Sequence, residues 1–157
     1  MESSYPWPIT PFDKQHPVRG FFGDPRIGDG GGKSFHTGID ISAPDGTPVY
    51  AVAPGRVSLG GPQNVVVATP GRNFGYWHVV PAVANGVRVP LHGLLGHIAA
   101  GWGHVHLAEH TTLPSPQGTY WNPLRPGAGA TGCAPPSPAS CATARAVRSA
   151  DGRALRP

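Results

Sequence analysis

The chain has 157 residues, enough for one domain with a modest core, and only 13% of them are charged. Its formal charge of +4 lies entirely in residues 125–157, because residues 1–124 hold seven Lys or Arg and seven Asp or Glu. This neutral main part has no basic stripe, which argues against a nucleic-acid partner. No apolar run approaches the ~18 residues of a transmembrane segment, and no export signal is visible at the amino terminus.

Residues 1–34 are rich in Pro, Gly and aromatic side chains. We expect them to form an extended lead-in that packs on the domain. The stretch GDGGGKS at 28–34 resembles a phosphate-binding loop, but the first glycine of that motif would fall on Ile27. The sequence therefore predicts turns here and no nucleotide site.

From residue 38 onward, short apolar or alternating runs are separated by turn residues at roughly ten-residue intervals, which is typical of a sandwich or barrel. No long stretch keeps a helical period without Gly or Pro. The sequence predicts an all-β fold, with a compact antiparallel β-sheet or sandwich core and no long helices. The expected strands lie within 39–42, 47–58 with a break at Pro54-Gly55, 64–69, 74–80, 86–98 and 104–109.

The composition changes after the Asn-Pro-Leu of residues 122–124. Residues 125–157 are mostly small residues, Pro and Arg, and they cannot bury a core. We expect a disordered tail there, and a folded domain over residues 35–124.

Two of the eight histidines, His104 and His106, are separated by one residue. On a β-strand they point to the same face, while Val105 and Leu107 point to the opposite face, toward a core. Two imidazoles on one face suit a metal ion, or one metal ligand beside one acid–base group.

His36 and Asp40 are a second candidate pair. On a regular strand their Cα atoms would lie roughly 13 Å apart, so they can share a metal only if the chain bends. Gly38 supplies the conformational freedom for that bend. Two histidines and a carboxylate make a three-ligand zinc site with an open position for water, the catalytic type. His78 shares a predicted strand face with Tyr76 and by itself indicates little.

Together these motifs resemble the M23 family of zinc metallopeptidases, the lysostaphin- and LytM-type peptidoglycan endopeptidases. The resemblance extends from about residue 16 to residue 124 and includes the closing Asn-Pro-Leu. It rests on four motifs in this order: His-x-x-x-Asp at 36–40, ISAPDGTPVYAVAPGRV at 41–57, Tyr-x-His at 76–78 and His-x-His at 104–106.

The resemblance implies a LytM-type fold with the metal in a groove between loops. It implies Zn2+ as the cofactor, with His36, Asp40 and His106 as its ligands. His104 and His78 are the implied catalytic residues, with His104 as general base and His78 stabilising the oxyanion, or with these roles exchanged. The implied activity is hydrolysis of peptide crosslinks in peptidoglycan, outside the cell or in the cell envelope.

The chain departs from the family pattern in two places. Residues 96–103 are shorter than the corresponding loop of the family and lack its Gly-Thr-Gly pattern, and His92 stands where Gly is common. An alternative function is therefore a catalytically silent envelope module that binds peptidoglycan or regulates a cell-wall amidase.

Other polar and aromatic residues near the motifs receive structural interpretations. On strand alternation, Glu109 points away from His106, so we expect it to be structural. Trp102 is expected either to line the groove or to pack in the core. We expect His92, His97 and His110 to lie at the surface or behind the metal ligands.

Overall fold

The computed structural model describes residues 5–27, 33–111 and 119–125, and the tail expected to be disordered lies almost wholly outside them. Within these residues the chain forms strands, turns and bends. None of the described residues belongs to a helix that is long and apolar enough to cross a membrane. All strand pairs in the described part are antiparallel, so the predicted all-β antiparallel fold is confirmed.

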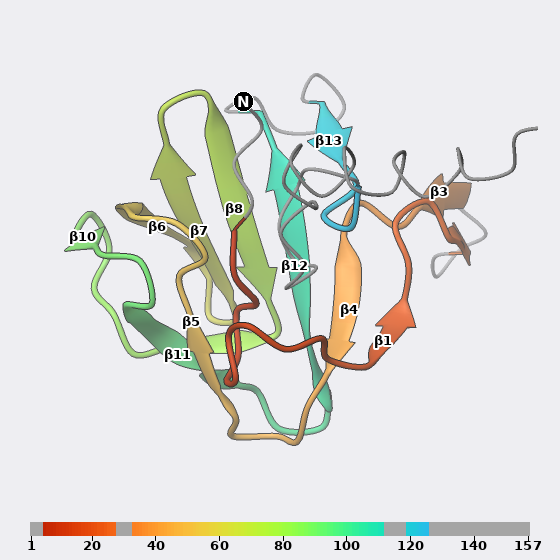
Figure 1. Cartoon of the computed structure of the whole chain (residues 1–157), viewed down its shortest axis with the longest axis horizontal. Helices are drawn as coiled ribbons and strands as arrows, with labels where there is room; N and C mark the ends of the chain where they lie inside the picture. The colour runs from red at the N-terminus through yellow and green to blue at the C-terminus, as the bar shows by residue number, and fades with distance from the viewer. Residues whose placement is uncertain (1–4, 28–32, 112–118, 126–157) are drawn as a thin grey trace, which may run out of the picture.

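The largest sheet has eight strands, and Figure 1 shows its central strands side by side. β13 (Tyr120–Trp121) pairs with one end of β12. The other strands follow in the spatial order β1 (Val18–Gly20), β4 (Ile39–Ser42), β12 (His104–His110), β8 (Arg72–Trp77), β7 (Asn64–Thr69), β6 (Gly55–Gly61) and β10 (Arg88–Val89).

Two smaller sheets complete the fold. The first contains β5 (Pro48–Tyr50), β11 (Leu94–Ile98) and β9 (Val79–Pro81), with β11 in the centre. The second pairs β2 (Pro25–Ile27) with β3 (Lys33–Phe35), and Figure 1 shows it on the β1 side of the molecule.

The core lies between one face of the large sheet and the three-stranded sheet. On β7, Val65 and Val67 are fully buried whereas Ala68 is exposed, the alternation of a half-buried strand. Val49 and Leu95 of the small sheet are fully buried in the same cluster. Full burial of each such side chain stabilises the fold by about 1.5–3 kcal/mol.

The strands match the predicted stretches, with two informative divisions. β4 and β7 coincide with the stretches 39–42 and 64–69. The stretch 74–80 is divided at His78, where the chain bends between β8 and β9. The stretch 86–98 is divided between β10 and β11 by a turn.

The expected lead-in is part of the fold in the structure. Tyr5, Trp7 and Ile9 are buried in the core, and β1 pairs with β4 in the large sheet. β3 also crosses the expected boundary between residues 34 and 35. The amino-terminal segment also lines the region in which the motif histidines lie, through Arg19 and Arg26.

Candidate metal centre

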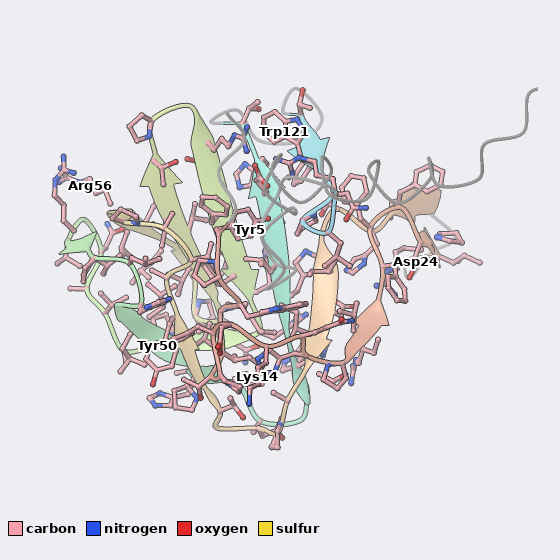
Figure 2. The ribbon with its side chains drawn as sticks, viewed as in Figure 1. Tyr5, Lys14, Asp24, Tyr50, Arg56 and Trp121 are labelled. Carbon is pink, nitrogen blue, oxygen red and sulfur yellow. The ribbon has the colours of Figure 1, made fainter. Side chains whose placement is uncertain are left out.

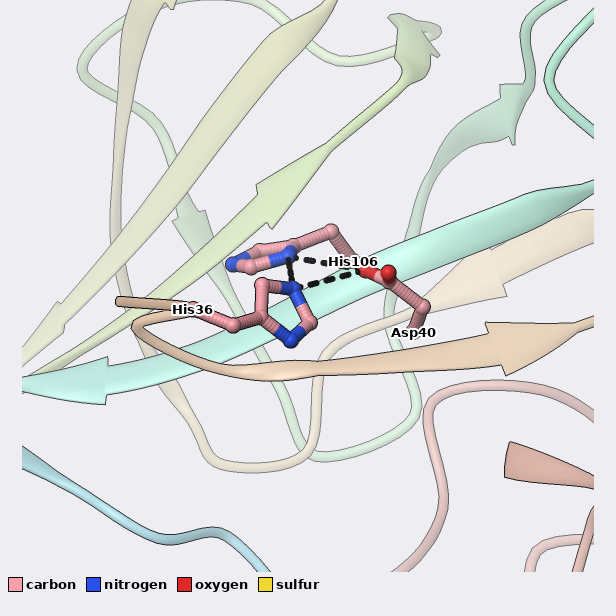
Figure 3. Close-up of side chains that lie close together, drawn as sticks. All are labelled: His36, Asp40 and His106. Atoms are coloured by element: carbon pink, nitrogen blue, oxygen red, sulfur yellow. Dashed lines mark hydrogen bonds and ion pairs between the residues drawn. The ribbon is translucent and has the colours of Figure 1, made fainter. Parts of the chain in front are cut away.

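β4 and β12 bring Asp40 and His106 together. The two residues are direct cross-strand partners, so their side chains leave the sheet on the same face. Ile41 and Leu107, next to them in sequence, are fully buried in the core on the other face. His36 approaches from the segment between β3 and β4, and Figure 3 shows the three side chains converging.

Three donor atoms meet at one point in this cluster. Nε2 of His36 lies 2.7 Å from Nδ1 of His106, and Oδ1 of Asp40 lies 3.0 Å from each of these nitrogens. Tetrahedral zinc with bonds near ~2.0–2.1 Å separates neighbouring donors by roughly 3.3 Å. Two imidazoles and a carboxylate therefore fit a zinc ion once the donors move apart by less than about 1 Å.

A backbone hydrogen bond orients His36. Nδ1 of His36 lies 2.9 Å from the carbonyl oxygen of Phe21, which can only accept, so Nδ1 carries the proton and donates it. The lone pair of the neutral ring is then on Nε2, the atom that faces Asp40 and His106. Histidines that bind metals usually donate their other N–H in this way.

Gly38 allows His36 and Asp40 to reach the same point, but for a different reason than expected. The chain bends at Gly38 as predicted, yet Gly38 is not among the described glycines with positive φ. A Cβ there would lie 2.7 Å from Nε2 of His106 and closer still to the carbonyl oxygen of Leu107. Glycine is needed because the backbone passes close to β12.

Arg26 holds the second carboxylate oxygen of Asp40. Nη2 of Arg26 donates to Oδ2 at 2.9 Å, which leaves Oδ1 for a metal. Gly20 makes room for this pair, because a Cβ on Gly20 would lie 2.9 Å from Cγ of Asp40 and 3.0 Å from Nη2 of Arg26. Burial alone would raise the pKa of Asp40, but the hydrogen bond from His106 and the nearby His36 lower it to about 2.

His104 lies beside the donor cluster on the same face of β12. Its Nδ1 lies 2.7 Å from the carbonyl oxygen of Trp102 and donates to it. The lone pair of the neutral ring is therefore on Nε2, which lies 3.6 Å from Oδ1 of Asp40. An unprotonated nitrogen next to a metal-binding point is what a general base requires.

His78 reaches the cluster from a bend, and the expectation that it shares a strand face with Tyr76 is wrong. Tyr76 is fully buried in the core, whereas His78 has a left-handed φ of 65° and lines the cleft. Its ring stacks on Trp102 with the centroids 3.5 Å apart and lies 4.7 Å from the ring of His104. Burial, and then the neighbouring His104 and His106, lower the pKa of His78 to about 4.

The three donors, His78 and His104 line one cleft of about 310 Å³, together with Trp102 and two arginines. A larger hollow of about 530 Å³ is lined mainly by Pro, Val and aromatic residues, with no histidine or carboxylate among its described lining residues. The smaller cleft is the candidate site because of its chemistry. Of the two alternatives for Trp102, the structure selects the cleft, where its side chain is 41% exposed.

Glu109 lies on the core face of β12, away from the donor cluster. It is fully buried and accepts hydrogen bonds from Tyr5, Arg72 and Arg125. Arg72 also lies over the ring of Trp121. These contacts join both ends of the described chain to the sheet, which agrees with the structural role expected for Glu109.

The remaining histidines lie outside the cleft. His92 and His97 are exposed as expected, and His92 stacks on Phe12 with the ring centroids 3.8 Å apart. The expectation for His110 is wrong, because it is buried against Tyr120 at the far end of β12 and is not behind the metal ligands.

Three residues of the site were not foreseen from the sequence. Arg19 and Arg26 line the cleft, and Asp45 accepts hydrogen bonds from the backbone N–H groups of Gly101 and Gly103 at 2.6 and 2.8 Å. These contacts join segments far apart in the sequence, and no local pattern signals them.

No family model and no curated protein matches the chain, but solved structures do. A zinc-containing peptidase from Vibrio cholerae matches with 21% identity and a TM-score of 0.57, covering 69% of this chain and 37% of that one. The catalytic domain of the antimicrobial peptidase lysostaphin from Staphylococcus simulans matches with 20% identity and a TM-score of 0.60, covering 69% of this chain and 90% of that one. The catalytic domain of a mutant of the prophage-encoded M23 protein EnpA from Enterococcus faecalis matches with 26% identity and a TM-score of 0.56, covering 76% of this chain and 94% of that one.

The fold is lysostaphin-like. This domain spans little more than a third of the Vibrio peptidase but matches nearly all of the two catalytic domains. A chain of the SpoIIQ–SpoIIIAH pore-forming complex also matches this lysostaphin-like domain, with 19% identity and a TM-score of 0.60, covering 79% of this chain and 90% of that one. The fold thus occurs both in peptidases and in a protein assembly, so an activity has to be argued from the cleft.

Proposed function

We propose that the protein is a zinc-dependent metalloendopeptidase that hydrolyses peptide bonds in peptidoglycan crosslinks, outside the cell or in its envelope. The observation that carries this function is the convergence of Nε2 of His36, Oδ1 of Asp40 and Nδ1 of His106 at one point of an open cleft. The lysostaphin-like fold supports it, because peptidases share that fold.

His36, Asp40 and His106 would hold the ion. When bound there, Zn2+ polarises a peptide carbonyl and makes water a stronger acid. Two of the three ligands are held by hydrogen bonds to other residues. The carbonyl oxygen of Phe21 holds Nδ1 of His36, and Arg26 holds Oδ2 of Asp40. Such supporting contacts typically contribute 10- to 100-fold to metal affinity or activity.

His104 and His78 would move protons and stabilise charge. Nε2 of His104 carries the lone pair of the neutral ring, so it would accept a proton from the attacking water and later return it to the leaving amine. His78 is neutral at pH 7 because its pKa is lowered to about 4, chiefly by burial. A neutral imidazole has one N–H to donate to the oxyanion that forms at the scissile carbonyl.

Metal analysis of the purified protein tests the ligand set. We expect close to one zinc per wild-type chain after dialysis and almost none in His36→Ala. His97→Ala is the matched control, because His97 is an exposed histidine of β11 outside the cleft. Equal zinc in the wild type and in His36→Ala would show that the metal is held elsewhere.

Release of soluble peptides from purified peptidoglycan, or cleavage of a glycine-rich peptide, tests the reaction. We expect zinc-dependent turnover in the wild type, and a fall of at least about 100-fold in kcat for His104→Ala with the zinc content unchanged. No cleavage of any wall preparation by zinc-loaded protein would contradict the peptidase function.

A silent envelope module is the second candidate. The specific observation in its favour is that the fold also occurs in the SpoIIQ–SpoIIIAH complex. Retention of peptidoglycan in a pull-down, with no turnover and no zinc after dialysis, would select this alternative.

A further inference from the structure

The side chain of Arg19 lies at the cleft with no partner among the residues that the structure describes. It extends from β1, and its Nη1 lies 3.7 Å from where a Cβ of Gly103 would be, next to the start of β12. No hydrogen bond or ion pair joins the side chain of Arg19 to any other residue of the described part of the chain. Arg26, the second arginine at the cleft, is paired with Asp40, and its side chain is still 44% exposed.

The charges that face the cleft do not balance. Asp40 is the single carboxylate among the described residues that line it, and Arg19 and Arg26 are both positive. A bound divalent ion would add two further positive charges. Like charges that line one cleft raise the free energy of the site unless an anion enters it.

A carboxylate is the anion that these arginines fit. The guanidinium group offers a planar set of N–H donors that matches the two oxygens of a carboxylate. The cleft of about 310 Å³ is at the lower end of the ~300–1,000 Å³ of ligand sites, so it holds a short peptide segment. A substrate carboxylate that reaches Arg19 therefore lies within about two residues of the bond at the metal.

We propose that Arg19, with Arg26 lining the same cleft, binds a carboxylate of the peptide, and that the site selects substrates with a free carboxylate close to the scissile bond. The part of this inference that concerns a scissile bond rests on the proposed function. Binding of the carboxylate does not require turnover, so the two can be tested separately.

The test compares two peptide pairs that differ in one charge, acetyl-Gly-Gly-Gly and acetyl-Gly-D-Ala, each as the free acid and as the amide. Dissociation constants are measured by NMR titration of zinc-loaded and zinc-free His104→Ala protein, in which proton transfer is blocked. We expect at least one acid to bind about tenfold more tightly than its amide, the range of one charge-assisted hydrogen bond. Adding Arg19→Gln is expected to reduce this ratio to less than about twofold.

Arg56→Gln is the matched control, because it removes the same charge from β6. Figure 2 shows Arg56 on the opposite side of the molecule from Asp24, and Asp24 directly precedes β2, the strand that carries Arg26 of the cleft. We expect Arg56→Gln to keep the full acid preference and Arg19→Lys to keep part of it. Equal binding of acid and amide, no binding of either pair, or an acid preference that survives Arg19→Gln would each overturn the inference.

Turnover separates carboxylate binding from a role of Arg19 in catalysis. In the wild-type background, Arg19→Gln should lower kcat/KM for acid substrates and leave that for amide substrates within about twofold. An equal loss for both would show that Arg19 acts on the reacting carbonyl and would overturn the inference. Acid preference in binding without any cleavage would keep the carboxylate site and reject the peptidase.

Discussion

Nδ1 of His104 donates to the carbonyl oxygen of Trp102 at 2.7 Å, while the indole of the same Trp102 stacks on His78 at 3.5 Å. One residue thus orients both of the histidines to which we assign proton transfer and charge stabilisation. Its backbone determines which nitrogen of His104 is free, and its side chain supports a left-handed His78. Residues 96–103, which are expected from the sequence to differ from the M23 pattern, therefore include the residue that positions these two rings.

Removing the indole should affect His78 more than His104, because the indole stacks on His78 at 3.5 Å and meets the ring of His104 only edge-on at 6.0 Å. Trp102→Ala keeps the backbone carbonyl, so His104 retains its orientation, and we expect kcat to fall roughly tenfold or more through loss of the oxyanion donor. Zinc content should not change, since Trp102 does not contact the donor cluster. Trp102→Phe, which can still stack, should recover most of the rate, and an equally inactive Trp102→Phe would argue against a stacking role.

Asp45 should hold the turn that contains Trp102 in place. Its carboxylate accepts from Gly101 and Gly103, and these hydrogen bonds lower its pKa. Asp45→Asn replaces one acceptor with a donor, so we expect faster amide exchange at Gly101 and Gly103 and roughly tenfold lower kcat. Asp13→Asn, an exposed aspartate outside the cleft, serves as the control; unchanged exchange in Asp45→Asn would refute the clamp.

Gly20 should be required for metal affinity. The methyl group of Gly20→Ala would meet both Asp40 and Arg26, which pushes the carboxylate out of position. We expect zinc binding to weaken about 10- to 100-fold in a chelator competition assay, with the fold intact. Gly60→Ala on β6 meets only the side chain of Asn64 and should bind zinc as the wild type does.

The buried Glu109 should make the fold sensitive to acid. Burial alone would raise the pKa of Glu109, but Arg125, Tyr5 and Arg72 lower it below its usual 4.5. Because the folded-state pKa is the lower one, this carboxylate stabilises the fold above about pH 4.5, and the contribution is lost as the pH falls through the folded-state pKa.

Glu109→Gln should therefore reduce the free energy of unfolding at pH 7 by about 3 kcal/mol, since it removes the buried negative charge that faces the half-buried Arg72 and Arg125. The loss should shrink toward pH 3. Denaturant unfolding at both pH values measures it. A destabilisation of the same size at pH 3 and pH 7 would mean that Glu109 acts through packing and not through its charge.

The sequence alone determined much of the fold and the choice of candidate ligands. Alternation of Ile with polar residues predicts β4, and a short run of Val predicts β7, both at their observed limits. Both patterns are local, because they can be recognised within one strand without knowing which strand pairs with it. The same alternation separates His104 and His106 from Val105 and Leu107. The spacing of His36 and Asp40 requires a bend at Gly38, and the structure has one there.

The tertiary structure decided which atoms meet. Asp40 faces His106 because β4 and β12 pair in one register, and a cross-strand register joins residues 66 positions apart that no local pattern relates. His78 enters the cleft through a left-handed bend that strand alternation does not predict. Arg19, Arg26 and Gly20 acquire their roles only because the amino-terminal segment folds against β4, where charge and space are set by contacts between distant segments.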